Sequence, residues 1–403
     1  MNVEELIERY AALTLKVGVN LGPGQPLAIN CYVEHAPLAR ALAAEAYRMG
    51  ARFVDVLYSD QVVRRSHIEA APEDALGWSP PWLIERLEAL RQADGALVSL
   101  TGSPDPTLLD RVEGSRVARS RMKALTEATL ELTSGGCRWC VLACPNPGWA
   151  RTVFGEPDLE RLWQAIATVV RLEEPDPLGA WRAHLGELER RAGLLNGYRF
   201  EALRFRGPGT DLEVGLLPES RWRSAVQGAD SVPFVANMPT EEVFTAPDAR
   251  RVSGTVAATY PLLLQGRLVD GLRVRFESGR AVELHADEGE ALIRAHVASD
   301  EGSCRLGEVA LVDSSSRVGR TGLVYYDTLL DENAAAHIAF GRAIAETVPE
   351  ARSLSIEERR ARGVNHSSLH TDFMIGSPEV SVAGLTAGGE TVSVIEAGVF
   401  VLS

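Results

Sequence analysis

The sequence predicts an α/β protein of two domains, with an N-terminal doubly wound α/β domain and a C-terminal β-rich α+β domain. The chain has 403 residues, which is more than one hydrophobic core usually serves. Its first half alternates between strand-like and helix-like segments, as expected for a parallel sheet covered by helices. After Gly197 the pattern changes to short β-rich segments separated by Gly, Pro and Asp.

The N-terminal domain, residues 1–197, is expected to begin with a βαβ unit. A buried strand is predicted at 26–31 and a helix at 36–49, where Ala and Leu recur at helical spacing. A second strand is predicted at 52–58, and a right-handed parallel connection between the two strands is the default. The later elements expected in this domain are strands at 96–100 and 139–143 and helices at 120–133, 159–171 and 178–195.

The C-terminal domain, residues 198–403, is expected to be mainly antiparallel. Short strands are predicted at 202–205, 212–216 and 272–277, each next to turn residues. The stretch from Pro378 onward has the pattern of a meander.

Composition excludes several classes of protein. The chain has 41 Lys and Arg against 55 Asp and Glu, a net charge of −14, which argues against a nucleic-acid partner. No run of apolar residues is long enough to span a membrane, and the acidic N-terminus does not resemble a signal peptide. Five cysteines do not make a disulfide framework in a chain of this length, so we expect a cytoplasmic protein.

Several familiar binding and catalytic motifs are absent or incomplete in the sequence. Neither standard glycine-rich phosphate loop is present, and there is no Gly-x-Ser-x-Gly nucleophile elbow. Cys137 and Cys140 have the spacing of half a zinc site, but no second Cys or His pair completes it. We interpret these cysteines as structural.

Residues suited to metal binding cluster in four segments of the C-terminal half. Imidazole and carboxylate groups together suit Zn, Co, Mn or Fe, and two His with three acids suffice for a pair of ions. Any one of these segments could be structural, but all four together favour a metal site. The segments contain Glu241 and Glu242, Glu308, His337, and His370 with Asp372.

Local structure is expected to position these groups. His370 and Asp372 are two residues apart on a predicted strand, so both can face one metal ion. His337 is expected in the first turns of a helix that Asp331 or Asn333 would cap, and the helix would extend over 334–345.

Three of these segments resemble those of the aminopeptidase T family of metallo-aminopeptidases. They are Asn237-Met-Pro-Thr-Glu-Glu-Val-Phe-Thr-Ala-Pro, Leu330-Asp-Glu-Asn-Ala-Ala-Ala-His and Leu369-His-Thr-Asp-Phe-Met-Ile-Gly-Ser. The resemblance extends nearly end to end and implies a homodimer that releases N-terminal residues from peptides with a free N-terminus. It also implies the metal ligands Glu242, Glu308, His337, His370 and Asp372.

One position departs from the family pattern. The family usually has a catalytic tyrosine seven residues after the histidine that corresponds to His337, whereas this chain has Ile344. On the expected helix Ile344 would share a face with His337. Tyr325 or Tyr326 could supply the missing hydroxyl.

The sequence therefore predicts an aminopeptidase with two divalent ions, Zn, Co or Mn, in which Glu241 or Glu308 transfers the proton. One alternative is a mononuclear Fe(II) ring-cleaving dioxygenase of the same fold, which would use His337, His370 and Asp372. A second alternative, suggested by Ile344, is a binding or assembly protein with weakened catalysis.

Overall fold

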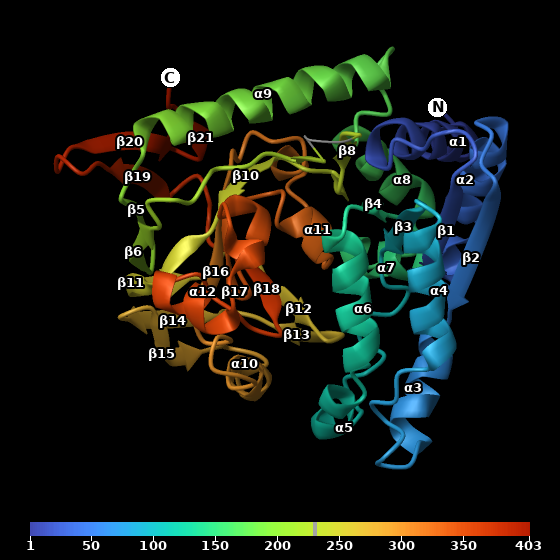
Figure 1. Cartoon of the computed structure of the whole chain (residues 1–403), viewed down its shortest axis with the longest axis horizontal. Coiled ribbons are helices and arrows are strands. Elements are labelled where there is room, and N and C mark those ends of the chain that lie inside the picture. The colour runs from blue at the N-terminus through green and yellow to red at the C-terminus, as the bar shows by residue number, and fades with distance from the viewer. Residues whose placement is uncertain (229–231) are drawn as a thin grey trace. The chain divides into compact units, whose positions relative to one another are not determined.

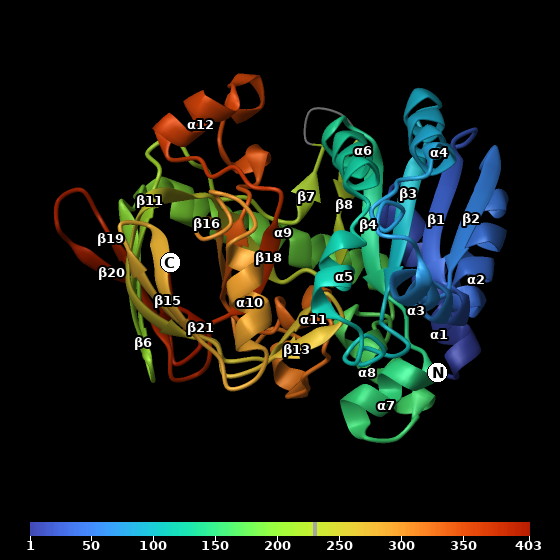
Figure 2. The same cartoon turned by 90° about the horizontal axis from the view of Figure 1, so that it is seen from below.

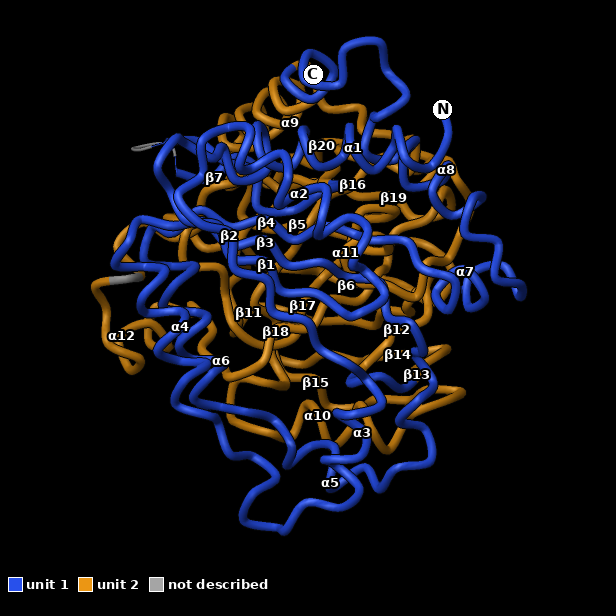
Figure 3. The backbone as a smooth tube through the Cα atoms, turned by 90° about the vertical axis from the view of Figure 1, so that its right-hand side faces the viewer, with its two compact units in different colours: residues 1–182, 226–239, 265–267 blue, residues 183–225, 240–264, 268–403 orange. Residues whose placement is uncertain are grey.

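The computed structural model describes residues 1–228 and 232–403 (Figure 1). These residues form two compact units, which Figure 3 shows in different colours. Unit 1 comprises Met1–Arg182, Val226–Pro239 and Gln265–Arg267, and unit 2 comprises Ala183–Ala225, Thr240–Leu264 and Leu268–Ser403. The chain first passes to unit 2 inside helix α9 (Pro177–Tyr198) and later returns to unit 1 twice. The single boundary expected after residue 197 does not capture these returns.

Unit 1 is built on a five-stranded sheet in which every neighbouring pair is parallel. The strand order is β2-β1-β3-β4-β9. The strands are β1 (Pro26–Tyr32), β2 (Phe53–Ser59), β3 (Ala96–Thr101), β4 (Arg138–Ala143) and β9 (Asn237–Met238). The first four lie within one or two residues of the predicted strands. The fifth, β9, comes from a segment far along the chain that the sequence pattern did not indicate.

Helices cover both faces of this sheet because the chain winds outward from β1 in two directions. The helices are α1 (Val3–Leu13), α2 (Ala36–Arg48), α3 (Gln61–Ala70), α4 (Pro81–Gln92), α5 (Gly114–Arg119), α6 (Lys123–Ser134), α7 (Pro147–Phe154) and α8 (Leu159–Val169). With right-handed crossovers, α2 covers one face, while α4 and α6 lie together on the other (Figure 2). This is the doubly wound arrangement that the sequence predicts.

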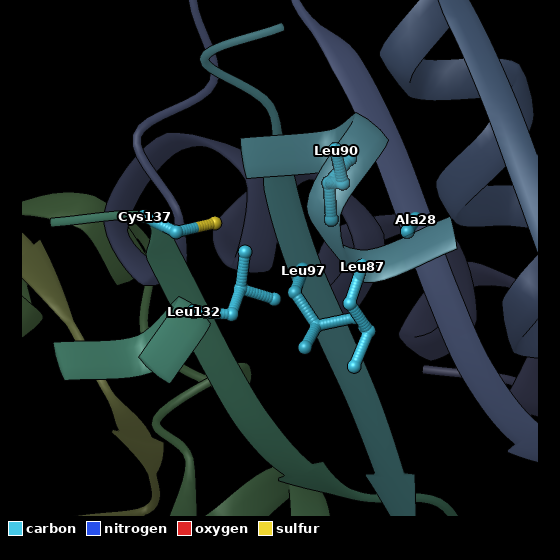
Figure 4. Packing of buried hydrophobic residues seen from close by; sticks show 6 residues of the cluster. All are labelled: Ala28, Leu87, Leu90, Leu97, Leu132 and Cys137. Atoms are coloured by element: carbon cyan, nitrogen blue, oxygen red, sulfur yellow. The ribbon is translucent and has the colours of Figure 1, made fainter. Parts of the chain in front are cut away.

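The core beneath α4 and α6 is a compact apolar cluster (Figure 4). Leu87 and Leu90 of α4 and Leu132 of α6 pack on Ala28 of β1 and Leu97 of β3. Ala28 and Leu97 are direct partners in the parallel register, so the two strands present a small and a large side chain side by side to the helices.

Unit 2 contains two antiparallel sheets. The larger has eight strands in the order β15-β14-β11-β6-β5-β19-β20-β21. Its strands are β5 (Ala202–Gly207), β6 (Thr210–Leu216), β11 (Pro247–Ala257), β14 (Arg273–Glu277), β15 (Arg280–His285), β19 (Ser381–Leu385), β20 (Thr391–Glu396) and β21 (Val399–Phe400). The final three form the predicted meander.

The smaller sheet of unit 2 has four strands in the order β10-β16-β17-β18. They are β10 (Glu242–Thr245), β16 (Leu306–Val312), β17 (His337–Gly341) and β18 (His370–Met374). Two short pairs, β7 (Val226–Gln227) with β8 (Phe234–Val235) and β12 (Leu262–Leu264) with β13 (Arg267–Val269), and the helices α10 (Glu290–Val297), α11 (Thr328–Asp331) and α12 (Ile356–Arg362) complete the chain.

One face of the four-stranded sheet packs on the eight-stranded sheet through aromatic rings. Phe340 of β17 stacks on Phe373 of β18 at 5.0 Å between centroids and meets Phe276 of β14 at 5.9 Å. All three rings are almost completely buried. Because side chains alternate along a strand, the residues on either side of Phe340 and Phe373 face the other way. That opposite face carries the polar groups described next.

None of the helices in the described part of the chain combines the length and apolarity needed to cross a membrane.

Candidate metal centre

The five residues proposed as metal ligands all lie on the four-stranded sheet of unit 2. Glu242 begins β10, Glu308 lies on β16, His337 begins β17, and His370 and Asp372 lie on β18. Each of the four strands therefore contributes at least one group, although the strands are far apart in sequence.

The pairing register places these groups on the same face of the sheet. In an antiparallel pair, opposite residues share a face, and so do residues two apart on one strand. Ala339 is opposite both Glu308 and Asp372, so these two carboxylates project on one side with His337, two residues before Ala339.

The same rule places His370 and Glu242 on this face. Gly341, on the His337 face of β17, is opposite His370. Glu242 is opposite Val312, which is four residues from Glu308 on β16. Ala339 and Gly341 are small, so the charged side chains meet above the strands without large neighbours between them.

Two groups of side chains come close enough to hold a metal ion. One consists of Glu242, Glu308 and His337, and the other of Glu308, His370 and Asp372. Glu308 belongs to both, with Oε1 at 4.0 Å from His337 Nε2 and Oε2 at 3.0 Å from His370 Nε2. Its two oxygens are thus turned toward different histidines, as a carboxylate shared by two ions requires.

The remaining distances complete each group. His337 Nε2 is 3.1 Å from Glu242 Oε2, and His370 Nε2 is 3.4 Å from Asp372 Oδ1. In both histidines Nε2 is the atom that faces the carboxylates.

Backbone carbonyl groups hold the other ring nitrogen of each histidine. Nδ1 of His370 lies 2.7 Å from the carbonyl oxygen of Arg342, and Nδ1 of His337 lies 3.3 Å from that of Ala335. A carbonyl oxygen can only accept, so Nδ1 carries the hydrogen and Nε2 can donate its lone pair to a metal.

Burial and neighbouring charges have opposite effects on the pKa values of the two histidines. Burial lowers the pKa of His337, but Glu242 and the other nearby carboxylates outweigh burial and raise it to about 10. The pKa of His370 is also raised well above its usual value, because Asp372 and Glu308 outweigh burial. The carboxylates therefore favour the protonated form of both rings.

The pKa shifts of the carboxylates differ from one another. Burial raises the pKa of Glu308 against the opposing effect of His370, and the charges of Glu242 and Asp372 add to the rise. Burial also acts to raise the pKa of Asp372, but His370 outweighs it, and the net shift is downward. The centre is a buried set of acids whose mutual repulsion favours a bound cation.

Glu332 is a functional candidate that the sequence reasoning missed. Its side chain is buried, and burial together with the charges of Asp372 and Glu242 raises its pKa well above the usual value. These interactions place a fourth carboxylate near the centre. The available signal was its position five residues before His337, in the segment already singled out.

The donor set fits divalent metal ions. Glu242 Oε2 is buried and, apart from His337 Nε2 at 3.1 Å, accepts no hydrogen bond within residues 1–228 and 232–403. With neutral imidazoles, the carboxylates of Glu242, Glu308 and Asp372 form an acidic site whose charge bound divalent cations would balance. Buried charges that lack such compensation are strongly unfavourable.

Glu241 lies beside the centre but in neither group that could hold an ion. Its backbone N–H donates to Asn333 Oδ1 at 2.6 Å, and its Oε2 is 3.8 Å from Nε2 of His184 on α9. The same nitrogen of His184 lies 2.7 Å from the carbonyl oxygen of Thr240. The segment that leads into Glu242 is therefore held by two side chains from elsewhere in unit 2.

The expected helix over 334–345 is wrong. His337–Gly341 is strand β17, paired with β16 and β18 and buried along its whole length. Asp331 and Asn333 are not helix caps. The Asp331 carboxylate accepts from the backbone N–H of Tyr325 and Asp327. The run of alanines favours a helix locally, but pairing on both sides overrides that preference.

Ile344 consequently does not share a helix face with His337. It precedes the short 3₁₀ helix Ala345–Thr347 and follows Gly341, the residue opposite His370. Ile344 lies in the segment after β17, two residues beyond Arg342, whose backbone carbonyl bonds to His370 Nδ1. Tyr325 is fully buried, and its hydroxyl is within reach of Thr321 Oγ1.

The cysteines form no disulfide in the described chain, and all five are buried. Cys137 donates to the carbonyl oxygen of Gly95 at 3.2 Å, as expected for a structural thiol. Within the described ranges, no cysteine belongs to a group of side chains that could hold a metal.

Comparison with known proteins gives a family for this architecture. The model of the family described as thermophilic metalloprotease (M29) matches residues 3–400. Aminopeptidase T of Thermus aquaticus is 41% identical over 406 residues, covering 99% of each chain. Aminopeptidase 2 of Geobacillus stearothermophilus is 36% identical over 403 residues, covering 98% of this chain and 97% of the relative.

Two solved structures have a fold similar to that of this chain. Wild-type AmpT from Thermus thermophilus superposes with a TM-score of 0.91 at 40% identity, covering 98% of this chain and 99% of that one. A 2,5-dihydroxypyridine dioxygenase from Pseudomonas putida KT2440 has a TM-score of 0.53 at 13% identity, covering 99% and 97%, which shows a common fold alone. The resemblance to aminopeptidase T and the expected peptidase class are confirmed. The chain belongs to the thermophilic metalloprotease family M29.

Proposed function

We propose that this peptidase is an aminopeptidase that uses two divalent cations, Zn, Co or Mn, to release N-terminal residues from peptides. The observation that carries the proposal is the position of Glu308 in both groups of metal-binding side chains. One carboxylate that turns an oxygen toward each group is suited to bridge two ions ~3.5–4 Å apart. The relatives named aminopeptidase T and aminopeptidase 2 support the same activity.

The side chains divide between the two ions as follows. Glu242 and His337 would hold one ion, His370 and Asp372 the other, and Glu308 both. Glu332, which is buried near the same carboxylates, is a further candidate ligand. When bound there, divalent ions would supply Lewis-acid chemistry, making the scissile carbonyl more electrophilic and a water molecule more acidic.

This chain's own residues then handle the proton. A carboxylate would accept the proton of the attacking water and give it to the leaving nitrogen, which becomes the new amino terminus of the shortened peptide. Glu308 is a candidate for this step because its two oxygens face different histidines, His337 and His370. Glu241 is the other candidate, since it neighbours Glu242 and belongs to neither ion group. The carbonyl bonds to Nδ1 keep both histidines in the tautomer that binds metal.

Metal analysis and chelation test the proposal. Protein purified without added metal should hold about two equivalents of Zn, Co or Mn per chain. A chelator at neutral pH should abolish release of amino acids from aminoacyl chromogenic substrates, and Co or Zn should restore it. Chelator-resistant hydrolysis would contradict the mechanism. One equivalent of iron without hydrolysis would support the ring-cleaving dioxygenase, and no metal at all a binding protein.

Substrate polarity provides a second test. A free α-amine is expected to bind a metal ion or a carboxylate of the centre, so N-acetylation should block cleavage. An acetylated peptide cut as fast as its free counterpart would indicate a different amidase. The homodimer and the cytoplasmic location stay predictions, which light scattering and cell fractionation would test.

A further inference from the structure

Asn333 connects three of the chain segments that carry the candidate ligands. Its side chain is fully buried, and its Oδ1 accepts from the backbone N–H of Glu241, the residue before Glu242. Its Nδ2 donates to the carbonyl oxygen of Leu329 at 2.8 Å, within α11. Its own carbonyl oxygen accepts from Ser316 Oγ at 3.0 Å.

Two of these bonds lead to segments that carry candidate ligands, and the bond to Leu329 fixes the Asn333 side chain to α11. The Glu241 bond holds the entry of β10, where Glu242 is the first residue. Ser316 lies four residues after the end of β16, the strand of Glu308. Asn333 itself is four residues before His337 and next to Glu332. Asn333 thus reaches the three ligands of one ion group by different routes: its side chain leads to Glu242, its backbone carbonyl to the segment after Glu308, and the chain itself to His337.

The bond to Glu241 is short, at 2.6 Å, and lies in a buried region, where a hydrogen bond constrains geometry strongly. The Glu242 carboxylate, whose Oε2 faces His337 Nε2 at 3.1 Å, depends on its backbone for position. A shift of the β10 entry would move that oxygen away from His337 Nε2.

We propose that Asn333 is a positioning residue that sets the affinity of the ion held by Glu242, Glu308 and His337, and has little influence on the ion held by His370 and Asp372. This rests on the proposed metal-dependent function. Partners that orient metal ligands typically change affinity by ~10–100-fold when removed. Asn333 would act on this ion because its Oδ1 holds the backbone of the residue before Glu242, and Glu242 belongs to that ion group alone.

The test measures each ion separately with Co²⁺, whose visible absorption reports coordination. In an Asp372→Asn background, the ion of the Glu242 group is the one retained. There, Asn333→Leu should weaken Co²⁺ binding at least tenfold. In a Glu242→Gln background, which retains the other ion, Asn333→Leu should change Co²⁺ binding less than twofold. Equal effects in the two backgrounds, or none in the first, would overturn the proposal.

Asn146 provides a matched control. It is a buried asparagine of unit 1 whose Oδ1 accepts from the backbone N–H of Trp149 and whose Nδ2 donates to the carbonyl oxygen of Gly102. Asn146→Leu should lower stability toward urea but leave Co²⁺ affinity unchanged. If it weakens Co²⁺ binding as much as Asn333→Leu, the effect is general destabilisation and the proposal fails.

Ser316→Ala gives a milder variant in case Asn333→Leu does not fold. It removes the bond to the Asn333 backbone carbonyl and should lower the affinity for the ion of the Glu242 group by about threefold. The affinity for the other ion should stay unchanged. No change in the affinity for either ion would count against the proposal.

If the wild-type protein binds no divalent cation, the proposed function fails. If it binds two and Asn333→Leu retains both affinities, this inference alone fails.

Discussion

Two buried histidines, one in each unit, have opposite electrostatic surroundings. His35 follows β1 in unit 1. Its Nε2 is 3.0 Å from the Gly102 carbonyl oxygen, and its Nδ1 accepts from the backbone N–H of Tyr32. Burial lowers its pKa to about 4, although the bond to Gly102 opposes this. His337 in unit 2 is equally buried, but its carboxylate neighbours raise its pKa to about 10.

This difference separates a structural histidine from a candidate ligand. Both rings are hydrogen-bonded to a backbone carbonyl, so burial and a satisfied N–H do not distinguish them. What distinguishes His337 is that its second nitrogen faces carboxylates, whereas that of His35 faces a backbone N–H and has no lone pair left for a metal. The surroundings of the second nitrogen, more than burial, indicate a metal centre.

The largest effect that would sharpen this contrast is expected from Glu308. Glu308→Gln should remove both ions, because the carboxylate belongs to both groups, and should lower activity by more than about 100-fold. Asp372→Asn should remove one ion. Metal content measured by mass spectrometry distinguishes these outcomes. Retention of two ions by Glu308→Gln would show that this carboxylate is not shared.

Core substitutions in the two units should have similar costs but different consequences. Leu97→Ala in unit 1 and Phe340→Ala in unit 2 should each lower stability by about 2–5 kcal/mol in urea unfolding, since both side chains are buried. Only Phe340→Ala should also weaken Co²⁺ binding, because Phe340 supports the back of the sheet that carries the ligands. Equal metal affinity in the two variants would contradict this role.

Acid should affect unit 1 through His35. The folded-state pKa of about 4 lies below the ordinary value of 6.5, so the unfolded chain takes up a proton first as pH falls. The resulting stability is present above pH ~6.5 and is lost as pH falls through about 4, a total of about 3 kcal/mol. Urea unfolding of His35→Gln should therefore depend less on pH over this range than wild type. If the free energy of unfolding depends on pH equally in wild type and His35→Gln, the low pKa assigned to His35 is wrong.

The smallest expected effect concerns Ile344, which adds no polar group to the centre. A tyrosine there could donate a hydrogen bond to the oxyanion, a contribution that can reach ~10²–10³ in turnover. Ile344→Tyr should raise kcat on an aminoacyl substrate several-fold without changing metal content, with Ile344→Phe as control for ring size. An unchanged or lower rate in a folded, metal-loaded variant would reject the missing-donor hypothesis.

Local pattern was sufficient for the first four strands of unit 1 and for its helix α2. Pro26–Tyr32 and Ala36–Arg48 were predictable because a short apolar run and helical periodicity are each properties of one segment. β9 was not predictable, because residues 237–238 join the sheet beside β4 through pairing alone. The ligand candidates were recognisable because His and acids clustered in long family-like segments.

The sequence by itself determined which groups are available to the centre, and its alternation on β18 already placed His370 and Asp372 on one side. It did not determine that His337 begins a strand, that Glu332 lies among the acids, or that Asn333 bonds Glu241. Those features depend on the register of β10, β16, β17 and β18, whose ligands come from positions 242 to 372. Only tertiary structure decides that register, because pairing between distant strands outweighs the helix preference of a short alanine run.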